Sequence, residues 1–170
     1  DNDGVQETAN CYIVPEANKT YRFPATVMGN GKTLPADESV AAAPGIIPSP
    51  LSPKSAKLLW QTSSSLISNV KLNNDCVYFT LNGDESGNFI PGNAVIAIYS
   101  GEDCSGSILW SWHLWITDAN LDAQLQTWKV HSSLDSYSSY QDPQLMDRNL
   151  GALSNSDWKT SGNNLSKGLN

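Results

Sequence analysis

The clearest alternation of apolar and polar residues runs over residues 107–118, Ser-Ile-Leu-Trp-Ser-Trp-His-Leu-Trp-Ile-Thr-Asp. With the two-residue period of a β-strand, one face carries Ile108, Trp110, Trp112, Leu114 and Ile116, and the other carries Leu109, Ser111, His113, Trp115 and Thr117. The first face is apolar throughout, and each tryptophan on it can bury about 150–250 Å² of surface. Because only a second layer can cover such a face, the segment predicts a central strand of a two-layer β domain.

Shorter alternating patterns precede this segment. They predict strands over residues 10–14, 20–27, 56–62, 66–72, 76–81 and 94–100. Leu58 and Trp60 are expected together on one face of the third strand, and Pro24 restricts the second strand to a sheet edge or a bulge. Residues 29–55 include five prolines and predict a loop. The strands over residues 76–81 and 94–100 and the tryptophan-rich strand are expected to form an antiparallel meander over residues 76–117.

The pattern weakens after Asp118. Residues 120–127 predict one or two helical turns, and residues 128–131 predict a short strand. A last apolar patch over residues 145–150 is expected to form a strand that closes a sheet.

The expected fold class is all-β, an immunoglobulin-like antiparallel β-sandwich with an irregular C-terminal tail. A chain of 170 residues at 39% hydrophobic is long enough for one such core. We expect a flexible lead over residues 1–9, the sandwich over residues 10–152 and the tail over residues 153–170.

Composition narrows the classes of function. The formal net charge of −7 favours no basic patch, so neither nucleic acid nor an anionic membrane surface is expected as a partner. The chain has no run of about 18 apolar residues, so no membrane insertion is expected. Charged residues make up only 16% of the chain, and abundant serine, asparagine, threonine and glycine are typical of an extracytoplasmic β domain.

Ser111, His113 and Asp118 supply the residue types of a hydrolase triad, but their spacing argues against one. Ser111 and His113 are two positions apart on one strand face, about 7 Å by strand rise, which is beyond hydrogen-bond reach. The chain also has no nucleophile-elbow sequence. We therefore expect no catalytic residues and no enzymatic activity, and we expect His113 to bond a neighbouring strand.

The sequence gives little support for a metal site. His113 and His131 are the only histidines, and no cysteine or carboxylate stands at zinc-ligand spacing from them, so no metal and no cofactor are expected. The segment from Asn82 to Asn88 resembles the first half of a calcium loop, but its twelfth position is Asn93, where a bidentate glutamate is needed. A hairpin tip explains this segment as well, and both interpretations stay open.

The three cysteines bear on the direction of the meander. If residues 76–117 form one, Cys76 begins its first strand, and Cys104 lies in the turn that returns to the same end of the sheet. This topology predicts a disulfide between Cys76 and Cys104, worth about 3 kcal/mol in the chain-entropy model. Cys11 lies within a predicted strand and is expected to remain a buried thiol. The alternative, that all three cysteines are reduced and buried, also stays open.

Tryptophans supply the candidate binding residues. Trp110 and Trp112 lie on the predicted core face, and the candidates for binding a partner or ligand are Trp115, Trp128 and Trp158, together with His113. Exposed tryptophans of this kind pack beneath a neighbouring domain or stack on a sugar ring.

Seven segments in series resemble the C-terminal region of fimbrillin-family surface proteins from anaerobic Gram-negative gut bacteria, over roughly residues 10–152. They are Asn-Cys-Tyr-Ile-Val at 10–14, Tyr-Arg-Phe-Pro at 21–24, Gly-Asn-Gly at 29–31, Leu-Trp-Gln at 59–61, Gly-Asn-Ala-Val-Ile-Ala at 92–97, Ile-Leu-Trp-Ser-Trp-His-Leu-Trp-Ile-Thr-Asp at 108–118 and Met-Asp-Arg-Asn-Leu-Gly-Ala at 146–152. Of the cysteines, only Cys11 belongs to the family pattern. The resemblance implies an extracellular lipoprotein or pilus-associated protein. It also implies that the tail begins a following module, similar to a C-type lectin or formylglycine-generating-enzyme fold, of which this chain holds only the start.

The residues and the resemblance together predict a non-catalytic, extracellular structural or adhesion domain at the cell surface. Its expected partners are neighbouring domains or other surface and pilus proteins. The alternative is a carbohydrate-binding module in which Trp115, Trp128 or Trp158 stacks on a glycan, because β-sandwiches serve both functions.

Overall fold

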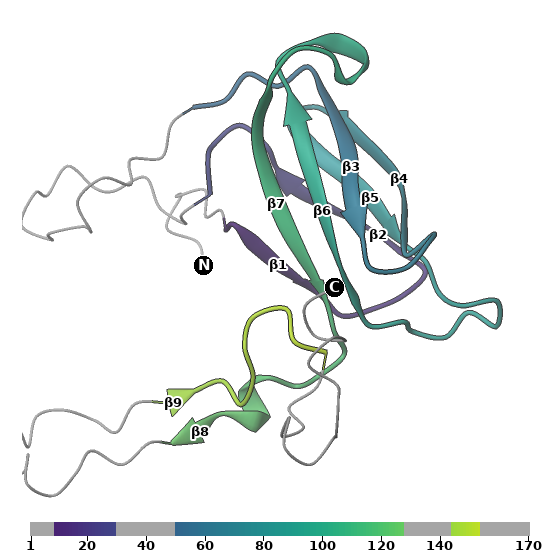
Figure 1. Ribbon diagram of the computed structural model, residues 1–170, viewed down its shortest axis with the longest axis vertical. Helices are drawn as coiled ribbons and strands as arrows, with labels where there is room; N and C mark the ends of the chain where they lie inside the picture. The colour runs from purple at the N-terminus through teal and green to yellow at the C-terminus, as the bar shows by residue number, and fades with distance from the viewer. Residues whose placement is uncertain (1–8, 30–49, 128–143, 154–170) are drawn as a thin grey trace, which may run out of the picture. The chain divides into compact units, whose positions relative to one another are not determined.

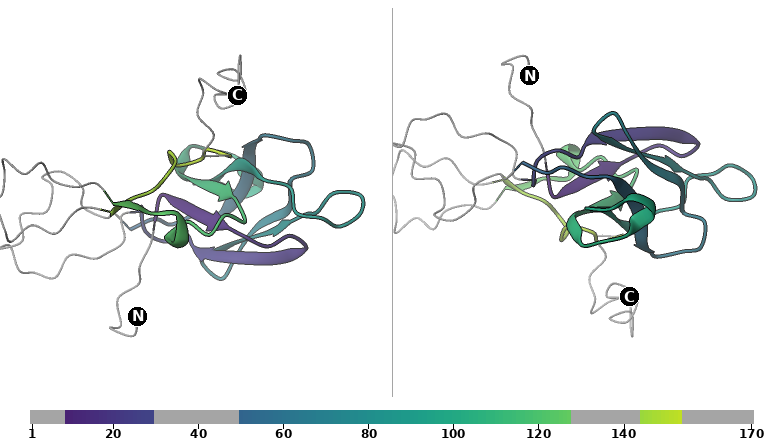
Figure 2. Two further views of the ribbon diagram at one scale, coloured as in Figure 1. Left: turned by 90° about the horizontal axis from the view of Figure 1, so that it is seen from below. Right: turned by 90° about the horizontal axis from the view of Figure 1, so that it is seen from above.

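A computed structural model describes residues 9–29, 50–127 and 144–153 of the chain and divides it into two compact units, residues 1–117 and 118–170. The first unit consists of two β-sheets that pack against each other, as Figures 1 and 2 show. The predicted all-β sandwich is therefore confirmed.

The larger sheet has four strands in the order β1 (Cys11–Val14), β7 (Ile108–Ile116), β6 (Gly92–Tyr99) and β3 (Ser55–Gln61). β1 runs parallel to β7, and the other neighbours are antiparallel. The tryptophan-rich strand β7 is thus central, as its apolar pattern predicts. A short 3-10 turn, η1 (Glu102–Cys104), connects β6 to β7.

The smaller sheet has three antiparallel strands in the order β2 (Lys19–Pro24), β5 (Cys76–Leu81) and β4 (Ile67–Asn73). Pro24 ends β2, which is an edge strand, as its missing amide hydrogen requires. All seven strands predicted up to residue 118 are present, with ends shifted by at most a few residues.

The predicted meander over residues 76–117 is wrong. β5 pairs with β2 and β4 in the smaller sheet, whereas β6 and β7 pair in the larger one. The tight turn is on the other side of β5, where Asn74 and Asp75 both have positive φ and join β4 to β5. The long connection over residues 82–91 crosses between the two layers, which a two-residue hairpin cannot do.

Aromatic side chains fill the core between the sheets. Phe23 of the smaller sheet lies 5.0 Å from Trp112 and 4.8 Å from Tyr12 of the larger sheet, measured between ring centroids. Phe79 extends the contact, 6.3 Å from Phe23 and 5.5 Å from Tyr21. Trp112 is fully buried, and so are Leu114 and Ile116 on the same face of β7. These tilted and stacked rings join the layers at the centre of the sandwich.

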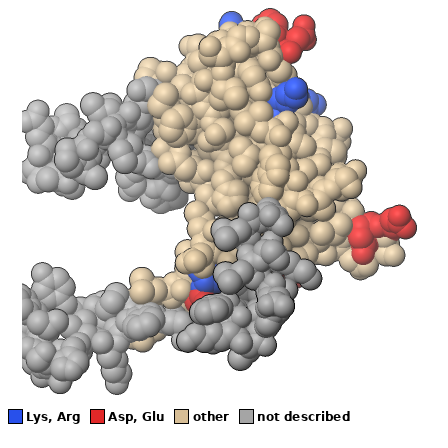
Figure 3. Space-filling view, in the orientation of Figure 1, with Lys and Arg blue, Asp and Glu red and all other residues tan. Residues whose placement is uncertain are grey.

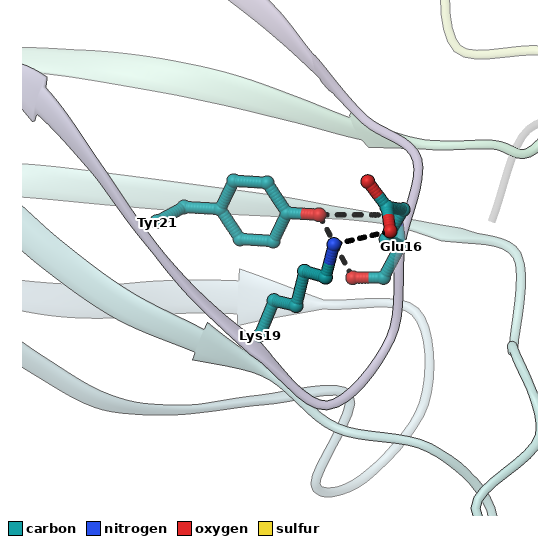
Figure 4. A network of polar contacts seen from close by, with 3 residues as sticks. All are labelled: Glu16, Lys19 and Tyr21. Carbon is teal, nitrogen blue, oxygen red and sulfur yellow. Dashed lines mark hydrogen bonds and ion pairs between the residues drawn. The ribbon is translucent and has the colours of Figure 1, made fainter.

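The turn from β1 to β2 carries the chain from one sheet to the other. Its polar network is drawn in Figure 4: Lys19 pairs with the Glu16 carboxylate, and the Tyr21 hydroxyl donates to the Glu16 carbonyl at 2.8 Å. The Glu16 amide donates back to the Tyr21 hydroxyl at 3.1 Å. Asn18, at φ 60°, supplies the left-handed residue of this turn.

The second unit contains the 3-10 turn η2 (Asp122–Gln124) and the two-stranded sheet β8 (Gln126–Thr127) and β9 (Gln144–Leu145). The predicted helical turn is confirmed by η2. The sandwich, however, ends at residue 117 rather than 152, and the strand expected over residues 145–150 does not close it, because β9 pairs with β8.

The strand expected over residues 128–131 lies outside the described residues. None of the helical segments in the described part of the chain is long and apolar enough to cross a membrane.

Candidate functional site: the outer face of the larger sheet

The outer face of the larger sheet is the surface turned away from the smaller sheet. Strand pairing sets which side chains share it, because neighbouring partners point the same way. One row crosses all four strands, from Trp60 through Val95 and His113 to Cys11. The next row holds Asn93, Trp115 and Ile13.

Trp60 belongs to this face because of a β-bulge in β3. The register against β6 shifts between Leu58 and Trp60, so Leu58 packs on the core while Trp60, opposite Val95, is 44% exposed. The expectation that Leu58 and Trp60 share one face is therefore wrong. An inserted residue changes the alternation at the point where it occurs.

Cys11, His113 and Asn93 form a connected group across β1, β7 and β6. The Cys11 Sγ lies 3.1 Å from His113 Nδ1, and the Asn93 Oδ1 lies 2.8 Å from His113 Nε2. The expectation that His113 bonds a neighbouring strand is confirmed. In this arrangement a thiol contacts an imidazole, and an amide oxygen holds the other nitrogen of that imidazole. The thiol thus has the place of a nucleophile, the imidazole that of its base and the amide that of the group that orients the base.

Burial determines the charge state of this group. Burial raises the pKa of the Cys11 thiol. A hydrogen bond from the backbone of Trp115 to the sulfur acts in the opposite direction and lowers this pKa in part. Burial also lowers the pKa of His113. Both shifts favour the neutral pair, in which the thiol donates to Nδ1 and the Nε2 hydrogen is donated to Asn93.

Exposed apolar side chains lie at the two edges of the outer face. Ile13 is 50% exposed, and Leu59 and Trp60 are each 44% exposed, on strands at the two edges of the sheet. Figure 3, in the orientation in which the larger sheet lies toward the viewer, shows mostly uncharged residues on this side.

The outer face of the smaller sheet has the opposite character. The hydroxyls of Thr20 and Thr80 lie 3.2 Å apart, and Arg22 reaches the Tyr78 hydroxyl at 3.5 Å. The exposed Lys71 lies opposite Tyr78 on the same face. This surface is thus of the polar, solvated kind that antiparallel sheets commonly present to water.

Of the remaining predicted binding residues, the structure describes only Trp115. Trp115 is fully buried, so its predicted role as an exposed binding residue is wrong. Its indole Nε1 makes no hydrogen bond to any described residue. Trp128 and Trp158 lie outside the described residues.

The predicted disulfide between Cys76 and Cys104 is absent, and all three cysteines are free thiols. Its topological basis fails with the meander, because β5, which begins at Cys76, lies in the smaller sheet. Cys104 lies in η1 beside β3, where its Sγ is 3.6 Å from the Ala56 carbonyl. The pairing over which the disulfide was predicted therefore does not exist.

The segment from Asn82 to Asn88 forms a loop held by its own carboxylate. Asp84 Oδ1 accepts hydrogen bonds from the amides of Ser86 and Asn88, both at 2.8 Å, and Oδ2 accepts from Asn88 Nδ2 at 3.0 Å. These hydrogen bonds lower the pKa of Asp84. Within the described residues, no group of three or more histidine, cysteine, aspartate or glutamate side chains is placed to hold a metal ion.

The sequence alone does not predict Asn93 or Cys11 as contacts of His113, because these contacts follow from the pairing of β7 with β1 and β6. Comparisons of the chain with protein-family models, with curated proteins and with solved structures give no match.

Proposed function

We propose that this chain is a non-catalytic, extracellular structural or adhesion domain of a fimbrillin-like cell-surface or pilus-associated protein. In this proposal the outer face of the larger sheet docks against a neighbouring protein domain. One observation carries it: the outer face of the larger sheet exposes Ile13, Leu59 and Trp60, while that of the smaller sheet is polar.

The chemistry of the exposed residues supports a protein as the partner. Aliphatic side chains with one tryptophan are typical of the centre of a protein interface, whereas a sugar site needs several polar groups around the stacking ring. An anionic membrane surface is disfavoured by the net charge of −7. Exposed apolar residues on one face of a sheet commonly mark an interaction site, and here they lie on its two edge strands.

The resemblance supports the cell-surface location. The segment at 10–14 supplies Ile13, the segment at 59–61 supplies Leu59 and Trp60, and the segment at 92–97 supplies Val95 between them. The same residues that suggest a fimbrillin-like protein therefore line the proposed docking face.

Binding of labelled, purified protein to the bacterium that produces it tests this proposal. The double variant Ile13→Ser/Trp60→Ser should lose at least about tenfold in apparent affinity, since interface tryptophans often contribute 2 kcal/mol or more. The matched variant Lys71→Ser/Tyr78→Ser, on the smaller sheet, should bind as the wild type does. Equal binding by both variants would contradict the proposal.

Treatment of the cells identifies the class of partner. Protease treatment should abolish binding, and periodate oxidation of surface sugars should leave it unchanged. The opposite result would favour the second candidate, a carbohydrate-binding module. In that alternative Trp128 and Trp158 stay candidates, and Trp60, the most exposed tryptophan among the described residues, is a further one.

A further inference from the structure

We infer that Cys11 is an exchange-reactive thiol that takes up a substituent from a low-molecular-weight disulfide, with His113 as its proton acceptor and Asn93 as a positioning residue. This modification site goes beyond the proposed docking function, which requires no covalent step.

The geometry defines the role of each member. The Asn93 Oδ1 at 2.8 Å accepts the hydrogen on Nε2, which fixes the histidine tautomer. The lone pair of Nδ1 then points at the Cys11 Sγ, 3.1 Å away. A thiol so placed can give up its proton during attack without first ionising in bulk water.

The other two cysteines lack such a base. Cys104 Sγ lies against the Ala56 carbonyl, an oxygen that accepts a hydrogen bond but is too weakly basic to take the proton. His113 is the one histidine among the described residues, and it contacts Cys11. Cys76 and Cys104 therefore provide internal controls within the same chain.

The reaction balances without any further reagent. The Cys11 thiol proton moves to His113 Nδ1 while Sγ attacks one sulfur of the disulfide RS–SR, forming Cys11–S–S–R. The old S–S bond breaks, its electron pair leaves on RS⁻, and this thiolate takes the proton back from His113 as RSH. No tetrahedral oxyanion forms, so the step needs only the base and the open approach to the sulfur.

The surroundings leave that approach open. β1 is an outermost strand of its sheet, and Cys11 is half-buried on it. On the same face lie the exposed Ile13 and, at the far end of the same row with two strands between, Trp60. An apolar or aromatic disulfide therefore suits this surface better than a highly charged one.

The test measures the rate of reaction with 2,2′-dithiodipyridine, a neutral aromatic disulfide, in three folded single-cysteine proteins. These retain Cys11, Cys76 or Cys104, with serine at the other two positions. At pH 7 we expect Cys11 to react at least about tenfold faster than either other thiol, a threshold below the roughly 10²–10⁴-fold that a positioned base typically contributes. A reaction rate of Cys11 that does not exceed the rates of both Cys76 and Cys104 would overturn the inference.

The pH profile separates base assistance from mere exposure. Besides Cys11 and His113, the described titratable side chains on this face are Lys57 of β3 and Tyr99 of β6, both in other rows. With His113 as base, the rate should be nearly flat from pH 6.5 to 8. In His113→Gln the rate should fall about tenfold for each unit by which the pH is lowered, as for a free thiol below its pKa.

Asn93→Ala should lower the rate and retain the flat profile, because it loosens the imidazole without removing it. Circular dichroism confirms that each variant is folded. Because the rate comparison of the three single-cysteine proteins and the pH profile of the protein that retains Cys11 both leave His113 and Asn93 intact, together they decide the question even if these variants do not fold. A steep profile in the protein that retains His113 would also overturn the inference.

Discussion

At the scale of single residues, burial separates the tryptophans into two groups with different roles. Trp112 is fully enclosed and meets Phe23 from the opposite sheet at 5.0 Å, whereas Trp60 is 44% exposed. The first therefore stabilises the fold, and the second is available to a partner. These roles predict different consequences for the same substitution at the two positions.

Trp112→Ala should lower the free energy of unfolding by about 3–5 kcal/mol, because it removes apolar contacts and leaves a cavity between the sheets. Trp60→Ala should change it by less than about 1 kcal/mol, because the side chain already faces solvent. Urea unfolding followed by circular dichroism gives both values. A Trp112→Ala protein as stable as the wild type would show that Trp112 is not central to the core.

His113 makes stability depend on pH in a defined direction. Its pKa is lowered in the folded state by burial, so the unfolded chain binds the proton more readily. The neutral His113 therefore contributes to the free energy of unfolding above the ordinary histidine pKa of about 6.5. This contribution is lost as the pH falls from there through the lowered pKa of His113 in the folded state. Only the neutral imidazole can accept a hydrogen bond from the Cys11 thiol at Nδ1, whereas Nε2 donates to Asn93 Oδ1 in both protonation states.

Replacing His113 by glutamine removes this titration. The stability advantage of the wild type over His113→Gln should therefore shrink between pH 8 and pH 5, as measured by urea unfolding at each pH. An advantage that stays constant or grows toward low pH would contradict the lowered pKa.

At the scale of elements, strand positions could be predicted from alternation, and their pairing could not. The pattern of residues 76–81 is the same whether the strand lies beside β6 or between β2 and β4, because in both cases Val77, Phe79 and Leu81 face the core. Sheet membership depends on how a ten-residue connection is routed, and local residue types do not encode that route.

Three features of the candidate site could not be predicted from the sequence. The exposure of Trp60 depends on a bulge, which no residue type in residues 58–60 requires. Trp115 is fully buried, although its neighbours on the same face of β7, Ser111 and His113, are polar and indicate solvent. The contact of Cys11 with His113 required the parallel pairing of β1 with β7.

The pairing of β5 with β2 can be checked by an engineered disulfide. Arg22 and Tyr78 are direct partners on the outer face of the smaller sheet, so cysteines at these positions, in a background without Cys11, Cys76 and Cys104, should form a bridge under mild oxidation. The control pair Tyr78→Cys/Val95→Cys joins different sheets and should not. Mass spectrometry after thiol alkylation reads out both. Bridging of the control pair alone would restore the meander.

At the scale of the whole molecule, the core belongs to one unit. Every buried residue of the hydrophobic cluster among the described residues lies between Val14 and Ile116, within the unit that ends at residue 117. The second unit contributes none of these residues. We therefore expect the sandwich to fold independently of the chain after residue 117.

A chain that ends at residue 117 should unfold in one cooperative transition and keep the near-ultraviolet circular dichroism of its packed aromatic rings. Thermal unfolding of the shortened and full-length chains provides the comparison. A shortened chain that lacks both the transition and the aromatic signal would show that residues 118–170 are needed to complete the core.

In the proposed function, the outer face of the larger sheet, and not that of the smaller sheet, contacts a neighbouring protein. A photoreactive amino acid placed at Leu59, or at Lys71 as the control, reports this contact on living cells of the producing bacterium. We predict a discrete protein adduct from position 59 that disappears when Trp60 is changed to serine, and no adduct from position 71. Adducts of equal yield from both positions, or from position 71 alone, would contradict the account.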